Sequence, residues 1–175
     1  MGIVKKEIPV TEKITTKKSL YKISDFSFLF WFRFIYPYRE EIERENIKYV
    51  LNILKKNFNT YLGSIFERIT EEFLRGKKPF SFTEIGKFWK REKEIDLIAL
   101  NEKTKEIALF EVKWKNLREK ETRNLLDELK EKAKEVDWNN EERKEYYGVI
   151  AKKINGKEKL RRERYLCYDL EDMKN

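Results

Sequence analysis

The sequence contains no histidine and no glutamine, and its only cysteine is Cys167. The absence of histidine excludes Ser-His-Asp and Cys-His catalysis, histidine zinc sites, and nucleases whose general base is an imidazole. A single cysteine excludes an internal disulfide and any multi-cysteine metal site, and it favours an intracellular, cytoplasmic protein. We expect Cys167 to be a small buried residue in a strand.

Glycines and long apolar runs are also scarce. The six glycines lie too far apart to form either standard phosphate-binding loop, so nucleotide binding of those two kinds is excluded. The most apolar stretch, residues 26–36, contains Arg33 and is far shorter than the roughly 20 residues that a bilayer requires. The N-terminus shows no signal-peptide pattern. We therefore expect a protein without a membrane partner.

Charge is abundant instead. Charged residues make up 41% of the 175 residues, while 40% is apolar and 14% aromatic, which is enough to build a core and disfavours disorder. The net charge of +8 favours a polyanionic partner. The surplus of Lys, Glu, Ile and Tyr is typical of proteins from hot environments. The length fits one domain with a small appendage.

Composition divides the chain into three segments. Residues 1–24 form a basic β-type arm, with strands expected at 7–10 and 20–23. Residues 25–57 form an aromatic-rich helical segment, in which a first helix, capped by Ser24 or Asp25, ends at Pro37 and a second covers about 39–56. We expect its aromatic side chains to pack in a core or at a partner interface, and base stacking is the alternative.

Residues 58–175 show the alternation of helix and strand patterns that is typical of the α/β class. A helix is expected to begin at the cap residue Asn59 and to end at Gly76. Three β-type runs follow, then a long amphipathic helix, and finally two strands separated by a basic connection. The expected ranges are 80–90, 94–100 and 106–114 for the runs, 118–136 for the helix, and 146–151 and 164–168 for the strands.

Two carboxylates lie on the apolar faces of neighbouring strands. Alternation puts Asp96 on the apolar face of strand 94–100 and Glu111 on that of strand 106–114. A hairpin loop of two or four residues would place them directly opposite each other, with Cβ atoms about 5 Å apart, whereas an odd loop would not. Opposed buried charges of one sign need a cation. Both Lys113, which shares the face, and a hard divalent metal ion satisfy that need.

Glu67 lies beside the apolar stripe of the helix expected at 59–76, one turn after Gly63. A glycine inside a helix costs about 1 kcal/mol relative to alanine. Its presence suggests that helix and sheet approach closely, which would bring Glu67 near the carboxylate pair. The alternative is a solvated surface glutamate.

Glu67 on a helix, Asp96 in Glu-Ile-Asp, and Glu111-Val112-Lys113 after a hairpin together resemble the PD-(D/E)XK nuclease superfamily. The chain is more closely similar to the C-terminal nuclease-like domain of a family of archaeal P-loop ATPases. The matching segments are 21–25, 30–37, 61–67, 85–89 and 110–114, so the similarity covers nearly the whole chain. It implies a core of helix, three-strand meander, helix and strand, with an N-terminal helical extension.

This resemblance implies hydrolysis of DNA phosphodiesters with Mg²⁺ or Mn²⁺. The metal ligands would be Asp96, Glu111 and the Val112 carbonyl, Lys113 would orient or activate the attacking water, and Glu67 would assist. A metal lowers the pKa of its bound water, so such a site needs no histidine. The alternative is a non-catalytic module that keeps this fold to bind DNA or a partner protein.

The expected partners are DNA and a P-loop ATPase or winged-helix protein, and a homodimer is also compatible. The chain lacks the ATPase, and residues 1–24 resemble the last hairpin of a winged helix, so we expect either an excised domain or a free-standing product. Two basic clusters are candidates for phosphate contact, with a solvated thermophile surface as the alternative. They are Lys90, Arg91 and Lys93, and Lys159, Arg161 and Arg162 within 152–164.

Overall fold

A computed structural model describes residues 3–174, whose centre is a five-stranded mixed sheet in the order β3-β4-β5-β6-β7. The first three strands form an antiparallel meander, and β6 and β7 run parallel to β5. The sheet confirms the predicted α/β class. The strands are β3 (Glu84–Lys90), β4 (Lys93–Asn101), β5 (Glu106–Leu117), β6 (Lys144–Ile154) and β7 (Leu166–Asp169).

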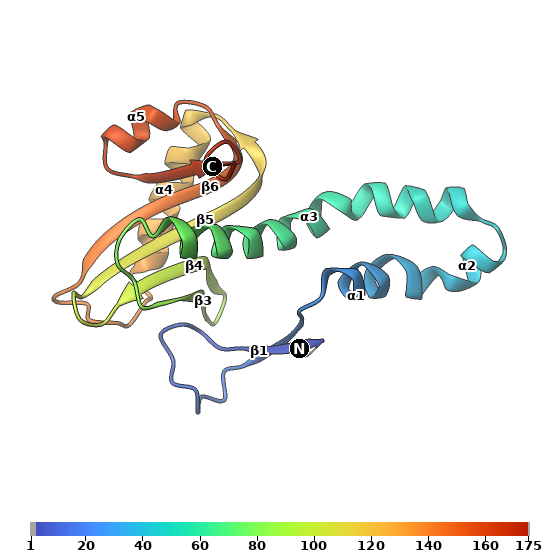
Figure 1. The fold of residues 1–175 in the computed structure, drawn as a ribbon, viewed down its shortest axis with the longest axis horizontal. Helices are drawn as coiled ribbons and strands as arrows, with labels where there is room; N and C mark the ends of the chain where they lie inside the picture. The colour runs from blue at the N-terminus through green and yellow to red at the C-terminus, as the bar shows by residue number, and fades with distance from the viewer. Residues whose placement is uncertain (1–2, 175) are drawn as a thin grey trace.

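Helices cover both faces of the sheet (Figure 1). The helix α3 (Ile47–Lys77) packs on one face through Phe66 and Leu74. The helices α4 (Glu119–Ala133) and α5 (Lys157–Arg162) cover the other face. The central strands are buried on both sides, which explains their nearly continuous apolar sequence. The parallel pairing of β5 and β6 requires a crossover between them, and α4 lies in that crossover.

The basic connection expected at 152–164 is mostly regular structure, because β6 extends to Ile154 and α5 follows it. Cys167 is fully buried in β7, as predicted. Among residues 3–174, no helix is long and apolar enough to cross a bilayer.

The N-terminal arm is a hairpin of β1 (Val4–Glu7) and β2 (Leu20–Ile23), and its connecting loop docks on the edge strand β3. The Val10 N–H donates to the Lys87 carbonyl at 2.9 Å. The loop thereby covers part of an otherwise open sheet edge. The strand expected at 7–10 is wrong: β1 ends at Glu7, and Pro9 has no N–H to contribute to a ladder.

A helical arm connects β2 to the sheet. It comprises α1 (Phe26–Phe30), a π-helical turn (Trp31–Ile35), a 3-10 turn (Tyr36–Tyr38), α2 (Arg39–Glu43) and the N-terminal half of α3. Asp25 caps α1, accepting from the N–H groups of Ser27 and Phe28 at 2.8 and 3.0 Å. Figure 1 shows α1, α2 and this half of α3 extending away from the sheet as an antiparallel pair.

Two expected helix boundaries in this arm are wrong. The helix expected at 39–56 is interrupted at 44–46, where Glu45 has a φ of 58°. From Ile47 a single helix then runs through Asn59 to Lys77, one residue past the end expected at Gly76, and the cap residue Lys78 is left-handed. Asn is only a weak helix breaker, and no proline interrupts 47–77. The division expected at 57/58 therefore lies inside α3.

The aromatic side chains of the arm divide into two sets. Phe30, Phe34 and Tyr61 pack against one another with ring centroids 5.3 to 5.7 Å apart, and Phe34 is buried. A second set is 41 to 50% exposed and consists of Phe28, Trp31, Phe32 and Tyr36. Core packing thus accounts for the first set, and the second forms an apolar surface on the arm.

Candidate carboxylate and lysine site

The register of the β4–β5 hairpin is the predicted one. Leu97 pairs with Phe110 and Asn101 with Glu106, and the loop between the strands has four residues, 102–105. The pairing ends at Leu97 and Phe110, so Asp96 and Glu111 occupy the next opposed positions. Glu111 lies on the face of the sheet that α4 covers, where Lys132 of α4 reaches it. Around Asp96 strict alternation is interrupted, because the β3–β4 register shifts between Ile98 and Ile95.

The two strands diverge at this point. The Asp96 side chain accepts the Val112 N–H through Oδ2 at 2.8 Å, in place of a backbone ladder bond. The side chains of Asp96 and Glu111 are only 14% and 8% exposed. Two largely buried carboxylates therefore face each other where the ladder opens.

Two lysines neutralise this pair. Lys113 Nζ donates to Glu111 Oε1 at 2.5 Å and lies 3.4 Å from Asp96 Oδ2. Lys132 Nζ, from the last turn of α4, donates to Glu111 Oε2 at 2.9 Å. The sequence analysis missed Lys132, because a lysine in the last turn of an amphipathic helix is ordinarily a solvated partner of the helix dipole. Both oxygens of Glu111 consequently hold an ammonium group.

Burial and charge shift the ionisation of the site in definite directions. Burial raises the pKa of Asp96, the charge of Glu111 raises it further, and Lys113 and the Val112 N–H offset only part of the rise. Burial lowers the pKa of Lys113, but the charges of Asp96 and Glu111 outweigh burial, so the pKa is raised overall. At neutral pH Lys113 is thus an ammonium, which donates hydrogen bonds and accepts no proton.

Glu67 is not in contact with the carboxylate pair. Its carboxylate forms an ion pair with Lys87 of β3, and Lys87 also lies 3.6 Å from Glu94. Glu67 belongs to α3, and its charge contributes to the raised pKa of Asp96. Within residues 3–174, no three Asp, Glu, Cys or His side chains come close enough together to hold a metal ion.

The expected role of Gly63 is wrong. A Cβ placed on Gly63 would meet no atom of the described chain within 4 Å, so no close helix-to-sheet approach requires a glycine there. The contact between α3 and the sheet lies further along the helix, where Phe66 packs on Trp114 of β5 with ring centroids 5.2 Å apart. The position of Glu67 follows from that contact.

The two basic clusters have different surroundings. Lys90, Arg91 and Lys93 are exposed at the turn between β3 and β4, where Lys90 Nζ donates to the Glu135 carbonyl at 3.3 Å. In α5 and the residues after it, ion pairs form instead. Arg161 binds Asp172 at 2.6 Å, Lys159 binds Glu119 at 2.8 Å, and Arg162 is exposed.

Arg161 is therefore part of a structural network near the C-terminal end of the described chain. Lys157 binds Asp169 at 2.7 Å and Asp172 at 2.8 Å, and Arg161 also donates to the Cys167 carbonyl at 2.9 Å. Burial raises the pKa of Asp172, but its hydrogen bonds from Arg161 and Lys157 outweigh burial and lower it to about 2. An arginine so engaged has little freedom to contact a phosphate.

Residues 31–125 match a family described as archaeal and bacterial proteins of unknown function, DUF234. The chain belongs to this family. The DUF234 match extends from the π-helical turn to α4 and includes Glu67, Asp96, Glu111 and Lys113.

The DUF234 chain is 38% identical over 174 residues to an uncharacterized protein of Methanocaldococcus jannaschii. The alignment covers 97% of this chain and 38% of that relative, so the chain spans less than two fifths of the relative's length. No solved structure matches the chain.

Proposed function

We propose that this protein hydrolyses phosphodiester bonds of DNA with a divalent metal ion, using a site of the PD-(D/E)XK type. The observation that carries the proposal is the meeting of Asp96, Glu111 and Lys113 where β4 and β5 diverge. The order of elements supports it: α3, the meander β3 to β5, α4 and β6 follow the order of helix, three strands, helix and strand that the nuclease resemblance implies.

The residues present fit Mg²⁺ or Mn²⁺. Magnesium ions in proteins are held by one or two carboxylates, with water and substrate phosphate completing the shell. Asp96 and Glu111 would supply the carboxylates, and the neighbouring Val112 carbonyl would supply a third oxygen. Burial and the charge of Glu111 raise the pKa of Asp96, so a bound cation would favour its ionised form. A bound cation would stabilise charge on the phosphate and lower the pKa of its water.

The lysines would act as donors. Lys113 is charged and lies beside both carboxylates, so its Nζ can orient a water molecule or a phosphate oxygen. Lys132 would hold Glu111 in place from α4, and it gives that carboxylate a partner in the absence of substrate. The Glu67–Lys87 pair would lie at the margin of the site.

Nicking of supercoiled plasmid in Mg²⁺ or Mn²⁺ tests the proposal. We expect Lys113→Met to lower the rate by about 100-fold or more, since loss of one positioned electrostatic donor costs that much. Asp96→Ala should lower it at least as far, because it removes a metal ligand. Lys134→Met is the matched control, because Lys134 caps the C-terminal end of α4 with its side chain 69% exposed and binds only Glu131 among the described residues. It should nick like wild type.

Thermal melting separates metal binding from chemistry. Millimolar Mg²⁺ or Mn²⁺ should raise the melting temperature of wild type and of Lys113→Met by mass action, and it should not raise that of Asp96→Ala. Absence of nicking by wild type in either metal would contradict the proposed activity, as would an equal loss in Lys134→Met.

A non-catalytic module is the second candidate. It is favoured by the lysine partners of Glu111 and by the exposed aromatic surface of the arm, which is suited to a protein partner. Since the chain spans 38% of its longer relative, an ATPase or winged-helix partner fits this candidate. If Lys113→Met unfolds the protein while wild type shows no nicking, the ammonium is a structural counter-ion and the second candidate is correct.

A further inference from the structure

A cavity of about 500 Å³ lies between the N-terminal hairpin, α1 and α3. A smaller cavity of about 170 Å³ adjoins it beside β3 and extends to Leu97 of β4. Glu67, Lys87 and Arg68 line both cavities. The two adjoining cavities thus extend from the helical arm to β4, the strand that carries Asp96. The volume of the larger cavity is in the range of ligand-binding sites.

The cavity carries an excess of positive charge. Three of its acidic residues are neutralised: Glu7 by Lys22 at 2.8 Å, Glu67 by Lys87, and Glu71 by Arg75 of the adjoining cavity at 2.7 Å. Three further cations of the lining have no ion-pair partner among residues 3–174. They are Lys5 of β1, Arg33 of the π-helical turn and Arg68 of α3.

These cations come from separate elements and face one hollow. Arg68 donates to the Ser24 carbonyl and lies over the Phe26 ring at 4.2 Å, and Arg33 lies 5.6 Å from the Phe34 ring centroid. Contacts with a neutral carbonyl and with rings hold the guanidinium groups in place without neutralising them. Their charge remains available to an anionic ligand.

The remaining lining is apolar. Ile23, Phe26 and Leu29 are partly exposed at the cavity. A hollow with cationic groups beside apolar and aromatic side chains matches an unpaired nucleic-acid strand, whose phosphates need cations and whose bases and sugars need apolar contact. A hollow of about 500 Å³ is too small to enclose a base-paired helix, so we consider an unpaired segment.

We propose that this cavity binds a single-stranded segment of nucleic acid and leads it toward the Asp96–Glu111 site. The inference rests on the proposed nuclease function and adds to it the form of the substrate and the part of the surface that holds it. The N-terminal hairpin thereby acts as one wall of the substrate path.

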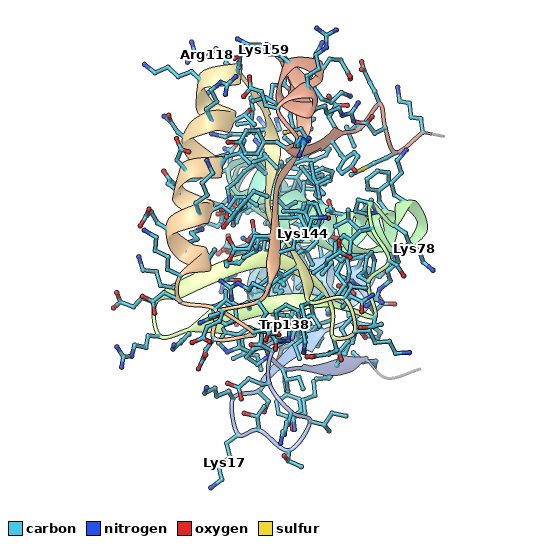
Figure 2. The ribbon with its side chains drawn as sticks, turned by 90° about the vertical axis from the view of Figure 1, so that its left-hand side faces the viewer. Lys17, Lys78, Arg118, Trp138, Lys144 and Lys159 are labelled. Atoms are coloured by element: carbon cyan, nitrogen blue, oxygen red, sulfur yellow. The ribbon has the colours of Figure 1, made fainter. Side chains whose placement is uncertain are left out.

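Fluorescence anisotropy in EDTA tests the binding apart from any cleavage. The probes are a labelled single-stranded DNA, the matching RNA strand, and the matching DNA duplex. The test variant is Lys5→Gln/Arg33→Gln. The control is Lys13→Gln/Lys17→Gln, which removes the same charge from exposed residues of the N-terminal hairpin loop that do not line the cavity. Figure 2 shows Lys17 at the far tip of the hairpin loop.

For single-stranded probes, we expect the test variant to lose about tenfold in affinity near 0.1 M salt. The slope of log affinity against log salt should flatten by about 1.4, from about 0.7 for each of two lost phosphate contacts. The control should keep the wild-type slope, and the duplex should bind more weakly than either strand. Comparison of the DNA and RNA strands tells which of them the cavity prefers.

Three results would overturn the inference: equal slopes for the test variant and wild type, equal flattening in the control, or equal affinity for duplex and single strand. Loss of affinity for an acidic peptide without loss for either strand would assign the cavity to a protein ligand. If wild type binds the single strand in EDTA as expected but cleaves no DNA in Mg²⁺ or Mn²⁺, the nuclease proposal fails and the binding site remains.

Discussion

The two halves of α3 lie in different surroundings. In the C-terminal half, Phe66 and Leu74 are buried against the sheet, whereas in the N-terminal half Tyr49 and Leu51 are 46 to 48% exposed. Yet the helix is continuous from Ile47 to Lys77. The N-terminal half is thus stabilised on one side only, by the helical arm, against which Val50 is buried and Tyr61 packs.

Two leucines on this helix provide the strongest test of the comparison. Leu74→Ala should lower the free energy of unfolding by about 2–5 kcal/mol, because it leaves a cavity at a fully buried position. Leu51→Ala should change it by less than about 0.5 kcal/mol, since Leu51 is exposed. Urea unfolding of both variants gives the values. Equal losses would mean that a partner or a second copy covers the arm in solution.

Gly148 of β6 extends the comparison to a closely packed part of the sheet. A Cβ on Gly148 of β6 would lie 2.5 Å from both the Phe110 ring and the Leu166 carbonyl oxygen. Because neither neighbour can move freely, Gly148→Ala should cost about 1–3 kcal/mol of stability through overpacking. Calorimetric melting checks this. An unchanged melting temperature would show that β6 and β7 separate more easily than their packing suggests.

In the sheet, the carboxylate pair should make the stability of the protein depend on pH. The raised pKa of Asp96 means that the folded state holds its proton more tightly than the unfolded chain does, so stability is lost as pH rises through the folded-state pKa. Asp96→Asn removes this loss. In EDTA the stability of Asp96→Asn relative to wild type should increase from about pH 4 to neutral pH.

Urea midpoints across this pH range measure the difference between the two proteins. If the stability of Asp96→Asn relative to wild type decreases as pH rises, Lys113 stabilises the ionised form of Asp96 by more than burial and Glu111 destabilise it. With millimolar Mg²⁺ the advantage of Asp96→Asn should shrink, because a bound cation favours the carboxylate.

The register of the hairpin was predictable from alternation for a loop of two or four residues, and the structure has four, 102–105. The start of α3 was not, since Asn59 carries a weak local signal that the continuous helix overrides, whereas its end was predicted to within one residue by Gly76. The partners of the carboxylates were only partly visible. Lys113 follows Glu111 by two residues, whereas Lys132 reaches it from a helix 21 positions away and only the packing of α4 places it there.

Gly63 gives the smallest expected effect and the sharpest test of the free space along α3. A Cβ there meets nothing within 4 Å, and the same holds for Gly76 near the end of the helix. Replacing a helical glycine by alanine should therefore raise the free energy of unfolding by about 0.5–1 kcal/mol at each position. Urea unfolding of Gly63→Ala and Gly76→Ala measures the gain. A loss at Gly63 alone would mean that the helix packs there more closely than this structure shows, and the helix-to-sheet approach expected from the sequence would be correct after all.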